Sequence, residues 1–237
     1  MRIVTWNCNG ALRNKFEHLS ELNADLYIIQ ECENPESAKH QQYISWAGNH
    51  LWKGDNKNKG LGVFAKNKTN LELIDWCNIY KNHEVKHFLP CLVNSDFQLL
   101  NIWTSQNKSP NFGYIGQLWK YLEINKSKFK KIILAGDFNS NTIWDEWDRW
   151  WNHSDVVSDL SKIEINSLYH RYFNEEQGKE TKPTFFLQRN RAKPYHIDYI
   201  FASKEIENNM TNFEIATIDK WLNYSDHLPV ICEINTL

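Results

Sequence analysis

Short apolar runs bounded by polar side chains recur along the whole chain, and this pattern limits the folds that the chain can adopt. The apolar runs lie at residues 3–4, 26–29, 132–135 and 199–201. The polar residues beside them or near the end of the chain are Asn7, Asn9, Gln30, Glu31, Asp137, Asn139, His196, Asp198, Asp226 and His227. Polar groups at the ends of buried strands are costly unless they are paired or bind a cation. The pattern therefore predicts a β-rich core that carries these groups to one edge, and it indicates a metal-assisted hydrolase.

The length and charge of the chain narrow the choice further. A chain of 237 residues is long enough for one large domain, and with no repeat or long linker we expect residues 1–237 to form a single catalytic domain. The formal net charge is −2, so the chain lacks the overall positive charge that is typical of many nucleic-acid-binding proteins. A polyanionic substrate would have to be held by local basic patches and a metal ion.

The cysteines and the hydropathy indicate where the protein works. The five cysteines are scattered without CxxC spacing, which predicts reduced, buried thiols rather than disulfides or a zinc site. We expect Cys8, between Asn7 and Asn9, to point into the core. No apolar run approaches the ~18 residues of a membrane span. We therefore expect a cytoplasmic protein without a membrane partner, and most simply a monomer.

Periodicity predicts alternating strands and helices. Helices are expected at residues 12–22, 114–125 and 144–151, and the last of these would bury Trp144, Trp147 and Trp151 on one face. Strands are expected at residues 2–7, 25–30, 62–65, 71–76, 88–93, 97–104, 131–136, 183–187, 195–201, 213–218 and 228–234. This order predicts an α+β fold in which two packed mixed β-sheets are flanked by helices, a four-layer α/β/β/α sandwich.

The polar residues form a ligand set that consists of oxygen donors. The carboxylates are Glu31, Asp137, Asp198 and Asp226, and the amides are Asn7, Asn9 and Asn139. Hard oxygen donors favour Mg²⁺ or Mn²⁺ over zinc. His227 is the clearest acid–base group, and a neighbouring carboxylate could fix its tautomer and raise its pKa. Each cluster alone is also typical of turns and caps, but the five clusters together favour a site.

The ordered motifs WNxNG, QE, GDFN, IDYIF and SDHLPV resemble the endonuclease/exonuclease/phosphatase superfamily, which has the deoxyribonuclease I-like fold. The resemblance extends over nearly the whole chain and implies a divalent-metal-dependent phosphodiesterase, most simply a DNA endo- or exonuclease. It implies that Glu31 is the principal metal carboxylate and that Asn7 and Asn9 support the metal and phosphate. Asp226 would bind or orient the metal. Family members divide over one-metal and two-metal schemes, and both remain open here.

The same resemblance implies roles for the remaining motif residues. Asp137 would align or deprotonate the attacking water, and Asn139 would hold the scissile phosphate. Asp198 would pair with His227, which would contact the phosphate and stabilise its charge.

Two segments are most similar to the exonuclease III and abasic-site endonuclease branch. They are Pro183-Thr184-Phe185-Phe186 and the run from His196 to Ser203, and in that branch aromatic residues such as Phe185 line the substrate pocket. Two positions depart from the branch. Trp103 stands where family nucleases usually carry Tyr or His, and because indole is only a donor, leaving-group stabilisation would depend on metal, water or Tyr114. His196 stands where the branch usually has Arg.

Three further groups have competing interpretations. Arg189 and Arg191, in the loop at residues 188–193, could contact substrate phosphates or lie on a solvated hairpin tip. The loop at residues 53–60 is interpreted as a solvated tip. Trp150 lies off the expected helix face and could stack on a base. His153 and His170 are expected to make ordinary polar contacts.

Several substrates remain compatible with the sequence. A nucleic acid is expected, with DNA favoured over RNA, although IDYIF also occurs in the deadenylase branch. A small or lipid phosphate ester would suit the near-neutral charge. A non-catalytic binding module is disfavoured because the metal and histidine groups are all retained.

Overall fold

Two six-stranded sheets form the centre of the computed structural model, which describes residues 1–109 and 111–235. In spatial order, the strands of the first sheet are β15 (Met210–Ile215), β16 (Val230–Ile234), β1 (Arg2–Asn7), β2 (Leu26–Cys32), β4 (Lys59–Ala65) and β3 (Asn49–Asn56). Those of the second are β11 (Ile165–Ser167), β14 (Asp198–Ser203), β10 (Ile132–Asp137), β9 (Phe97–Trp103), β8 (Phe88–Val93) and β5 (Leu71–Leu73). Two short hairpins pair β6 (Ile79–Tyr80) with β7 (His83–Glu84), and β12 (Phe185–Phe186) with β13 (Pro194–Tyr195).

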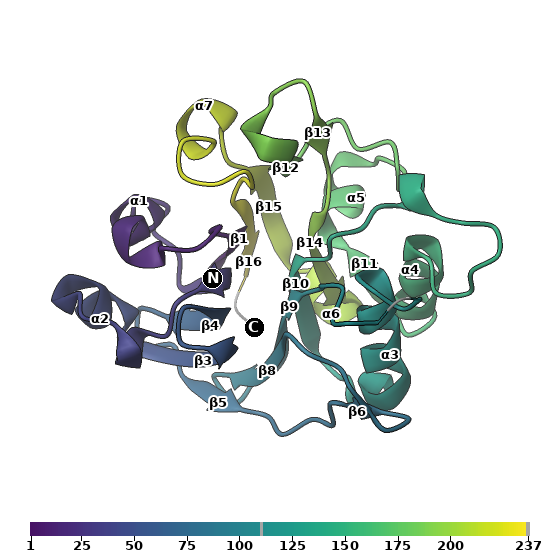
Figure 1. Cartoon of the computed structure of the whole chain (residues 1–237), viewed down its shortest axis with the longest axis horizontal. Coiled ribbons are helices and arrows are strands. Elements are labelled where there is room, and N and C mark those ends of the chain that lie inside the picture. Colours follow the sequence, from purple (N-terminus) through teal and green to yellow (C-terminus); the bar gives the residue numbers. More distant parts are fainter. Residues whose placement is uncertain (110, 236–237) are drawn as a thin grey trace.

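Helices cover the outer faces of both sheets, as Figure 1 shows. The helices are α1 (Phe16–Ser20), α2 (Gln41–Ala47), α3 (Ile115–Asn125), α4 (His153–Ser161), α5 (Leu168–Phe173), α6 (Lys204–Glu207) and α7 (Ile218–Trp221). One apolar cluster, which includes Ile28 and Ile133, lies between the sheets. A second packs α1, α2 and α7 on the first sheet, and a third packs α3 and α4 on the second sheet. The predicted four-layer α+β sandwich is confirmed.

The strand registers bring the polar motifs to one edge of the sandwich. β1 and β2 are parallel and pair Asn7 with Gln30. β9 and β10 are also parallel and end together, so that Trp103 pairs with Asp137. The antiparallel strand β14 begins at this edge, where Asp198 pairs with Asp137. Residues separated by up to about two hundred positions therefore meet because strands of both sheets end or begin there.

The helix expected at residues 12–22 is interrupted. A 3₁₀ turn at Leu12–Asn14 and the short helix α1 replace it, and Lys15 between them has the non-helical angles φ −132° and ψ −14°. The ammonium of Lys15 donates to the carbonyls of Cys8 and Gly10, at 2.6 and 2.8 Å. These contacts tie Lys15 to the loop after β1, where a regular helix would carry it away from that loop.

The helix predicted at residues 144–151 is wrong, and so is the burial of Trp144 and Trp147, whereas Trp151 is half-buried against Phe112. Trp147 is 96% exposed and Trp144 is 44% exposed. Asn152 is the cause: its amide donates to the carbonyls of Glu146 and Arg149 and accepts from the Glu146 N–H, which folds the segment into a loop. A capping box between Asn152 and Asp155 then starts α4 at residue 153.

The burial of the cysteine thiols partly matches the expectation that all of them are buried. Cys8 is fully buried in the core, and Cys32, Cys91 and Cys232 are also buried, but Cys77 is exposed. All five thiols are free. Among the described residues, no helix is both long and apolar enough to cross a membrane.

Candidate active site

Asp137, Asp198 and His227 meet at the shared edge of the two sheets, and we call them the catalytic cluster. One ligand atom from each residue lies within 4.8 Å of the others, and all three residues are buried. His227 Nδ1 is 2.9 Å from Asp198 Oδ2, and His227 Nε2 is 3.9 Å from Asp137 Oδ2. The predicted Asp198–His227 pair is therefore present, and its histidine faces the end of β10.

The segment that carries His227 is attached to β1 rather than left as a free turn. Ser225 Oγ donates to the Asn7 carbonyl at 2.8 Å, and the Trp6 indole N–H donates to the His227 carbonyl at 3.0 Å. The Ser225 hydroxyl also accepts the His227 N–H. These contacts fix the imidazole against the end of β1, so the SDH motif is part of the site and not only a turn.

Asp137 is held by two asparagine side chains. Asn7 Nδ2 donates to Asp137 Oδ2 at 2.9 Å, and Asn139 donates to both carboxylate oxygens, from its backbone N–H and from Nδ2, at 2.8 Å each. Asn139 has φ 45°, a left-handed conformation that asparagine tolerates better than most residues. Both amides therefore fix the orientation of one carboxylate at the mouth of the site.

Gly136 permits this close arrangement. Its φ is +143°, and a Cβ at this position would lie 1.9 Å from the Ile102 carbonyl oxygen. A side chain would push β10 away from β9. The glycine of GDFN is thus required for the contact between the two strands that position Asp137 and Trp103.

The catalytic cluster has shifted proton affinities. Burial raises the pKa of Asp137 to about 7, although the positive charge of His227 opposes the shift. Burial alone would lower the pKa of His227, but the carboxylates of Asp198 and Asp137 outweigh it and raise this pKa to about 9. Near neutral pH the imidazole is therefore a cation, and Asp137 can exchange a proton.

Glu31 enters the same edge through a bulge. The pairing of β2 with β4 shifts between Gln30 and Cys32, and Glu31 has φ 62°. Its Oε1 lies 3.3 Å from Asn7 Nδ2, and its Oε2 lies 2.7 Å from Lys59 Nζ. The bulge re-aims the Glu31 carboxylate toward Asn7.

Lys59 was missed by the sequence interpretation, which placed residues 53–60 on a solvated tip. Its ammonium pairs with Glu31 and also lies 5.1 Å from the centre of the Trp103 ring. The β3–β4 hairpin returns at Lys59 beside the β2 bulge, and this pairing depends on a register that periodicity does not reveal.

Asn9 and Asp226 form a second polar contact at the exposed side of the site. Asn9 Nδ2 donates to Asp226 Oδ1 at 3.0 Å, and the Asn9 N–H donates to Asn7 Oδ1 at 3.0 Å. The side-chain amide and the backbone N–H of Asn9 therefore link Asp226, next to His227, to Asn7.

The aromatic residues singled out from the sequence, Phe185, Trp103 and Tyr114, take different positions. The Phe185 ring lies 4.5 Å from the His227 ring, so Phe185 borders the site. Trp103 stacks on His87 at 4.5 Å and faces Lys59. Tyr114 is 46% exposed and precedes α3, and its N–H donates to the Ser105 carbonyl.

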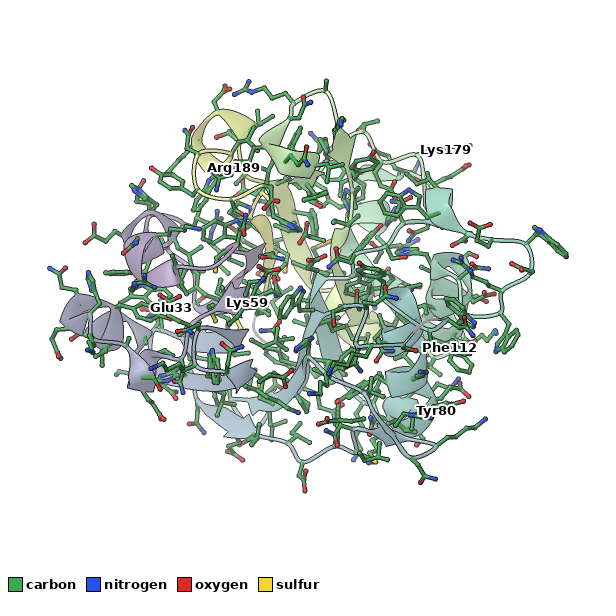
Figure 2. The ribbon with its side chains drawn as sticks, in the orientation of Figure 1. Glu33, Lys59, Tyr80, Phe112, Lys179 and Arg189 are labelled. Atoms are coloured by element: carbon green, nitrogen blue, oxygen red, sulfur yellow. The ribbon has the colours of Figure 1, made fainter. Side chains whose placement is uncertain are left out.

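Arg189 and Arg191 already have partners on neighbouring segments. The Arg189 guanidinium donates to the carbonyls of Asn223 and Tyr224, at 3.3 Å each, and Arg191 pairs with Asp219 of α7 at 2.7 Å. Figure 2 places Arg189 between α7 and β12. Both cations are exposed, and contact with a phosphate would have to compete with these weak bonds.

Thr184 and Asn101 make hydrogen bonds that hold residues of the site in place. The sequence interpretation did not assign a role to either residue. Thr184 Oγ1 donates to Asp198 Oδ2 at 2.7 Å and accepts the N–H groups of Ile197 and Asp198. Asn101 on β9 accepts from Gln30 Nε2 at 2.9 Å and donates to the Ile29 carbonyl on β2. Asn101 thus bridges the two sheets below the catalytic cluster, and the polar residue within an apolar strand was the available signal.

Comparison with known proteins settles the family. The model of the endonuclease/exonuclease/phosphatase family matches residues 4–227. The chain belongs to this family. It is accordingly a hydrolase of phosphoric esters, and enzymes of this family depend on a divalent metal ion. No curated protein sequence matches the chain.

Solved structures with the same fold include several DNA-processing members. A 3′ phosphatase from Neisseria bound to a product DNA hairpin is 17% identical, with a TM-score of 0.75 and full coverage of both chains. An AP endonuclease from Archaeoglobus fulgidus is 14% identical, with a TM-score of 0.72 and full coverage of both chains. The catalytic domain of APE2 from Xenopus laevis is 15% identical, with a TM-score of 0.64, and the match covers 99% of this chain and 91% of that one. At these identities the likeness establishes the fold.

The donor atoms of this family member fit a hard divalent cation near Glu31. The Glu31 carboxylate is 14% exposed and is balanced by an ammonium, so a positive charge is already accommodated there. The catalytic cluster offers a second set of ligand atoms, because one atom from each of its three residues lies within 4.8 Å of the others. Glu31 and Asn7, whose side chains lie 3.3 Å apart, and Asn9 with Asp226 next to Asn7, supply the oxygen donors that a divalent ion would require.

Proposed function

We propose that residues 1–237 form one catalytic domain that hydrolyses phosphodiester bonds in DNA with Mg²⁺ or Mn²⁺. The observation that carries this proposal is the convergence of Asp137, Asp198 and His227 beside Glu31 at one edge. The DNA hairpin bound to the Neisseria 3′ phosphatase, and the name of the Archaeoglobus AP endonuclease, support DNA as the polymer. Oxygen donors support magnesium or manganese as the ion.

Asp137 is proposed to align the attacking water and to accept its proton. Its pKa of about 7 suits that exchange near neutral pH. The amides of Asn7 and Asn139 hold one orientation of the carboxylate. A base held in place by two hydrogen bonds loses little energy to reorientation during reaction.

His227 is proposed to contact the scissile phosphate as a cation. Asp198 holds its Nδ1 side, so Nε2 faces the site. A fixed positive charge stabilises the charge that develops on phosphate oxygens during in-line attack. A divalent ion held by Glu31, with Asn9 and Asp226, would add Lewis-acid stabilisation of the same phosphate.

Residues around the site are proposed to position the substrate. Phe185 would contact the nucleotide beside His227, and Trp103 and Tyr114 would lie along the opposite side. Arg189 and Arg191 would contact flanking phosphates from the rim. Trp103 carries no proton that it could transfer at neutral pH, so leaving-group stabilisation is proposed to depend on the metal, on water or on Lys59.

A substrate panel tests this function. Plasmid, single-stranded, abasic and 3′-phosphorylated DNA, RNA, and bis(p-nitrophenyl) phosphate are each incubated with Mg²⁺, Mn²⁺ or EDTA. We expect turnover of DNA that EDTA abolishes and that either ion restores. The rate should fall steeply with salt, because several phosphate contacts release counterions.

Two outcomes would contradict the proposal. Activity that persists in EDTA after dialysis would refute the metal requirement. Turnover of the small ester with a flat salt response, while every DNA remains intact, would instead assign a small phosphate ester as substrate.

A further inference from the structure

A large pocket beside α3 is separate from the catalytic cluster and has features of a ligand site. We call it the α3 pocket. It has a volume of about 670 Å³, within the range of about 300–1,000 Å³ that is typical of small-ligand sites. Its aromatic lining consists of Tyr80, Phe112, Trp119 and Trp150. Figure 2 shows Tyr80 and Phe112 on the α3 side of the molecule, away from Lys59, which lies nearer the centre of the view.

The aromatic rings of the α3 pocket are arranged around one another and remain partly exposed. Phe112 lies 6.0 Å from Trp119 and 6.2 Å from Trp150, and the Phe112 and Trp150 rings are inclined by 70°. Trp150 is 63% exposed. Its ring therefore offers accessible surface beside Phe112, which is the arrangement that base stacking requires.

Lys120 supplies a buried positive charge to the same pocket. It is only 8% exposed, yet its ammonium forms no ion pair within residues 1–109 and 111–235. The ammonium lies 3.5 Å from Ser109 Oγ and 4.7 Å from the centre of the Phe112 ring. Burial lowers the pKa of Lys120. The lowered pKa indicates that the ammonium is partly desolvated, and an anionic ligand in the pocket would offset this cost.

The charge of the pocket contrasts with that of the whole chain. Four lysines and one glutamate line the pocket, whereas the whole chain has a formal net charge of −2. The four are Lys81, Lys86, Lys108 and Lys120. Lys86 is already paired with Asp55, but Lys81 and Lys108 are exposed. This local positive charge favours an anionic ligand. The aromatic side chains favour a ligand with a flat ring that can stack on them.

The loop that forms one wall is continuous with the active site and is held in place. It follows Trp103, the residue of β9 that pairs with Asp137. Asn107 donates to the Glu84 carbonyl at 2.9 Å and to Gln117 Oε1 at 2.8 Å, which fixes the loop to β7 and α3. This loop therefore joins the end of β9, at the catalytic cluster, to the wall of the α3 pocket.

We propose that the α3 pocket binds one unstacked nucleotide of a single-stranded segment that flanks the scissile phosphate. The base stacks against Phe112 and Trp150, and its phosphate lies against Lys120. This inference rests on the proposed nucleic-acid substrate and narrows it to DNA with a single-stranded flank. A duplex end would have to unpair to fill the pocket.

Binding without turnover tests the proposal. Fluorescence anisotropy in EDTA measures the affinity of labelled oligothymidine of about ten nucleotides, a length within the site sizes typical of single-strand binders. We expect Phe112→Ala and Trp150→Ala each to weaken binding about tenfold, since stacking contributes ~1–3 kcal/mol per base. Lys120→Met should weaken binding and reduce the slope of log affinity against log salt by about 0.7, the value for one single-strand phosphate contact.

Matched variants separate the pocket from general surface effects. Trp147→Ala removes a more exposed tryptophan of the same loop that does not line the pocket. Lys128→Met removes one charge just beyond α3, also outside the pocket. Both should bind like the unaltered chain. Equal losses in the pocket and control variants would overturn the proposal, as would wild-type affinity in all three pocket variants.

Photocrosslinking locates the base directly. An oligonucleotide with one 5-iodouracil is irradiated on the protein, and peptides are mapped by mass spectrometry. We expect adducts on Phe112 or Trp150. Adducts confined to Trp103 or Phe185 would show that the strand binds only at the active site.

Failure of this proposal can be distinguished from failure of the proposed function. Binding and crosslinking in EDTA do not require hydrolysis, so they report on the pocket even if DNA is not cleaved. Conversely, the pocket variants should hydrolyse bis(p-nitrophenyl) phosphate at the same rate as the unaltered chain. This ester is too small to reach the α3 pocket from the active site. A loss there would mean that the substitutions disturb the active site and would refute a separate pocket.

Discussion

Two buried polar clusters lie on either side of β14, and they differ in the hydrogen-bond and charge partners of their histidines. The catalytic cluster includes Asp198, and the ring nitrogens of His227 face carboxylates. On the other side Tyr199 contacts a histidine cluster, which consists of His153, His170 and His196. Within the described residues, neither ring nitrogen of His153 has a hydrogen-bond partner, nor has His196 Nε2.

The difference separates the protonation state of His227 from that of His153. Neighbouring carboxylates raise the pKa of His227 despite its burial, whereas burial lowers the pKa of His153 to about 4. One histidine is therefore a cation at neutral pH and the other is neutral. Burial alone does not determine which role a polar group takes, because the nearby charges decide its protonation.

The largest expected effect comes from Asp137→Asn, which keeps the shape of the catalytic cluster and removes its proton acceptor. We expect kcat to fall about 1,000-fold, within the range of about 10²–10⁴ for a general base. Steady-state kinetics on the best substrate of the panel measure this change. Asp96→Asn is a suitable control, because Asp96 pairs with Lys131 in a different part of the molecule. Near-normal kcat in Asp137→Asn would remove Asp137 from the mechanism.

The second prediction concerns how the free energy of unfolding depends on pH through His153 of the histidine cluster. The pKa of His153 is about 4 when folded against an ordinary value of 6.5, so the unfolded chain binds more protons between these values. Stability is therefore lost as pH falls from about 6.5 to 4, by on the order of 3 kcal/mol from this group. His153→Phe keeps a ring beside Tyr199 but cannot titrate.

Urea unfolding at pH 7.5, 6 and 5 measures this difference. We expect His153→Phe to resemble the unaltered chain at pH 7.5 and to be increasingly more stable as the pH falls. Parallel losses of stability in both proteins would show that His153 is not kept neutral by the fold.

The smallest expected effect is that of Thr184→Val, which removes the hydroxyl below Asp198. We expect about tenfold lower activity and a loss of about 1–3 kcal/mol in stability, because two backbone N–H groups lose their acceptor. Thr184→Ser, which keeps the hydroxyl, should restore most of both. If Ser and Val were equally impaired, the hydroxyl would not be what orients Asp198.

Sequence alone predicted that the polar motifs meet at one edge, because strand ends can be placed from the apolar runs whatever the loops do. Asp137 and Asn7 could be placed in this way. Lys59 could not, since its contact with Glu31 depends on the β3–β4 register and on a bulge in β2. The tryptophan loop was mistaken for a helix because helical spacing was present without a buried face. Asn152 supplies loop hydrogen bonds that outweigh that spacing.

The antiparallel pairing of β1 with β16 has a consequence for how the enzyme is made. The ribosome releases Asn7 long before Ser225, yet Ser225 Oγ donates to the Asn7 carbonyl beside this pairing. The catalytic cluster therefore cannot assemble on a nascent chain that lacks β16, and closing so long a loop slows the late step of folding. The residues from β1 through β16 must all be synthesised before the protein can cut a phosphate ester.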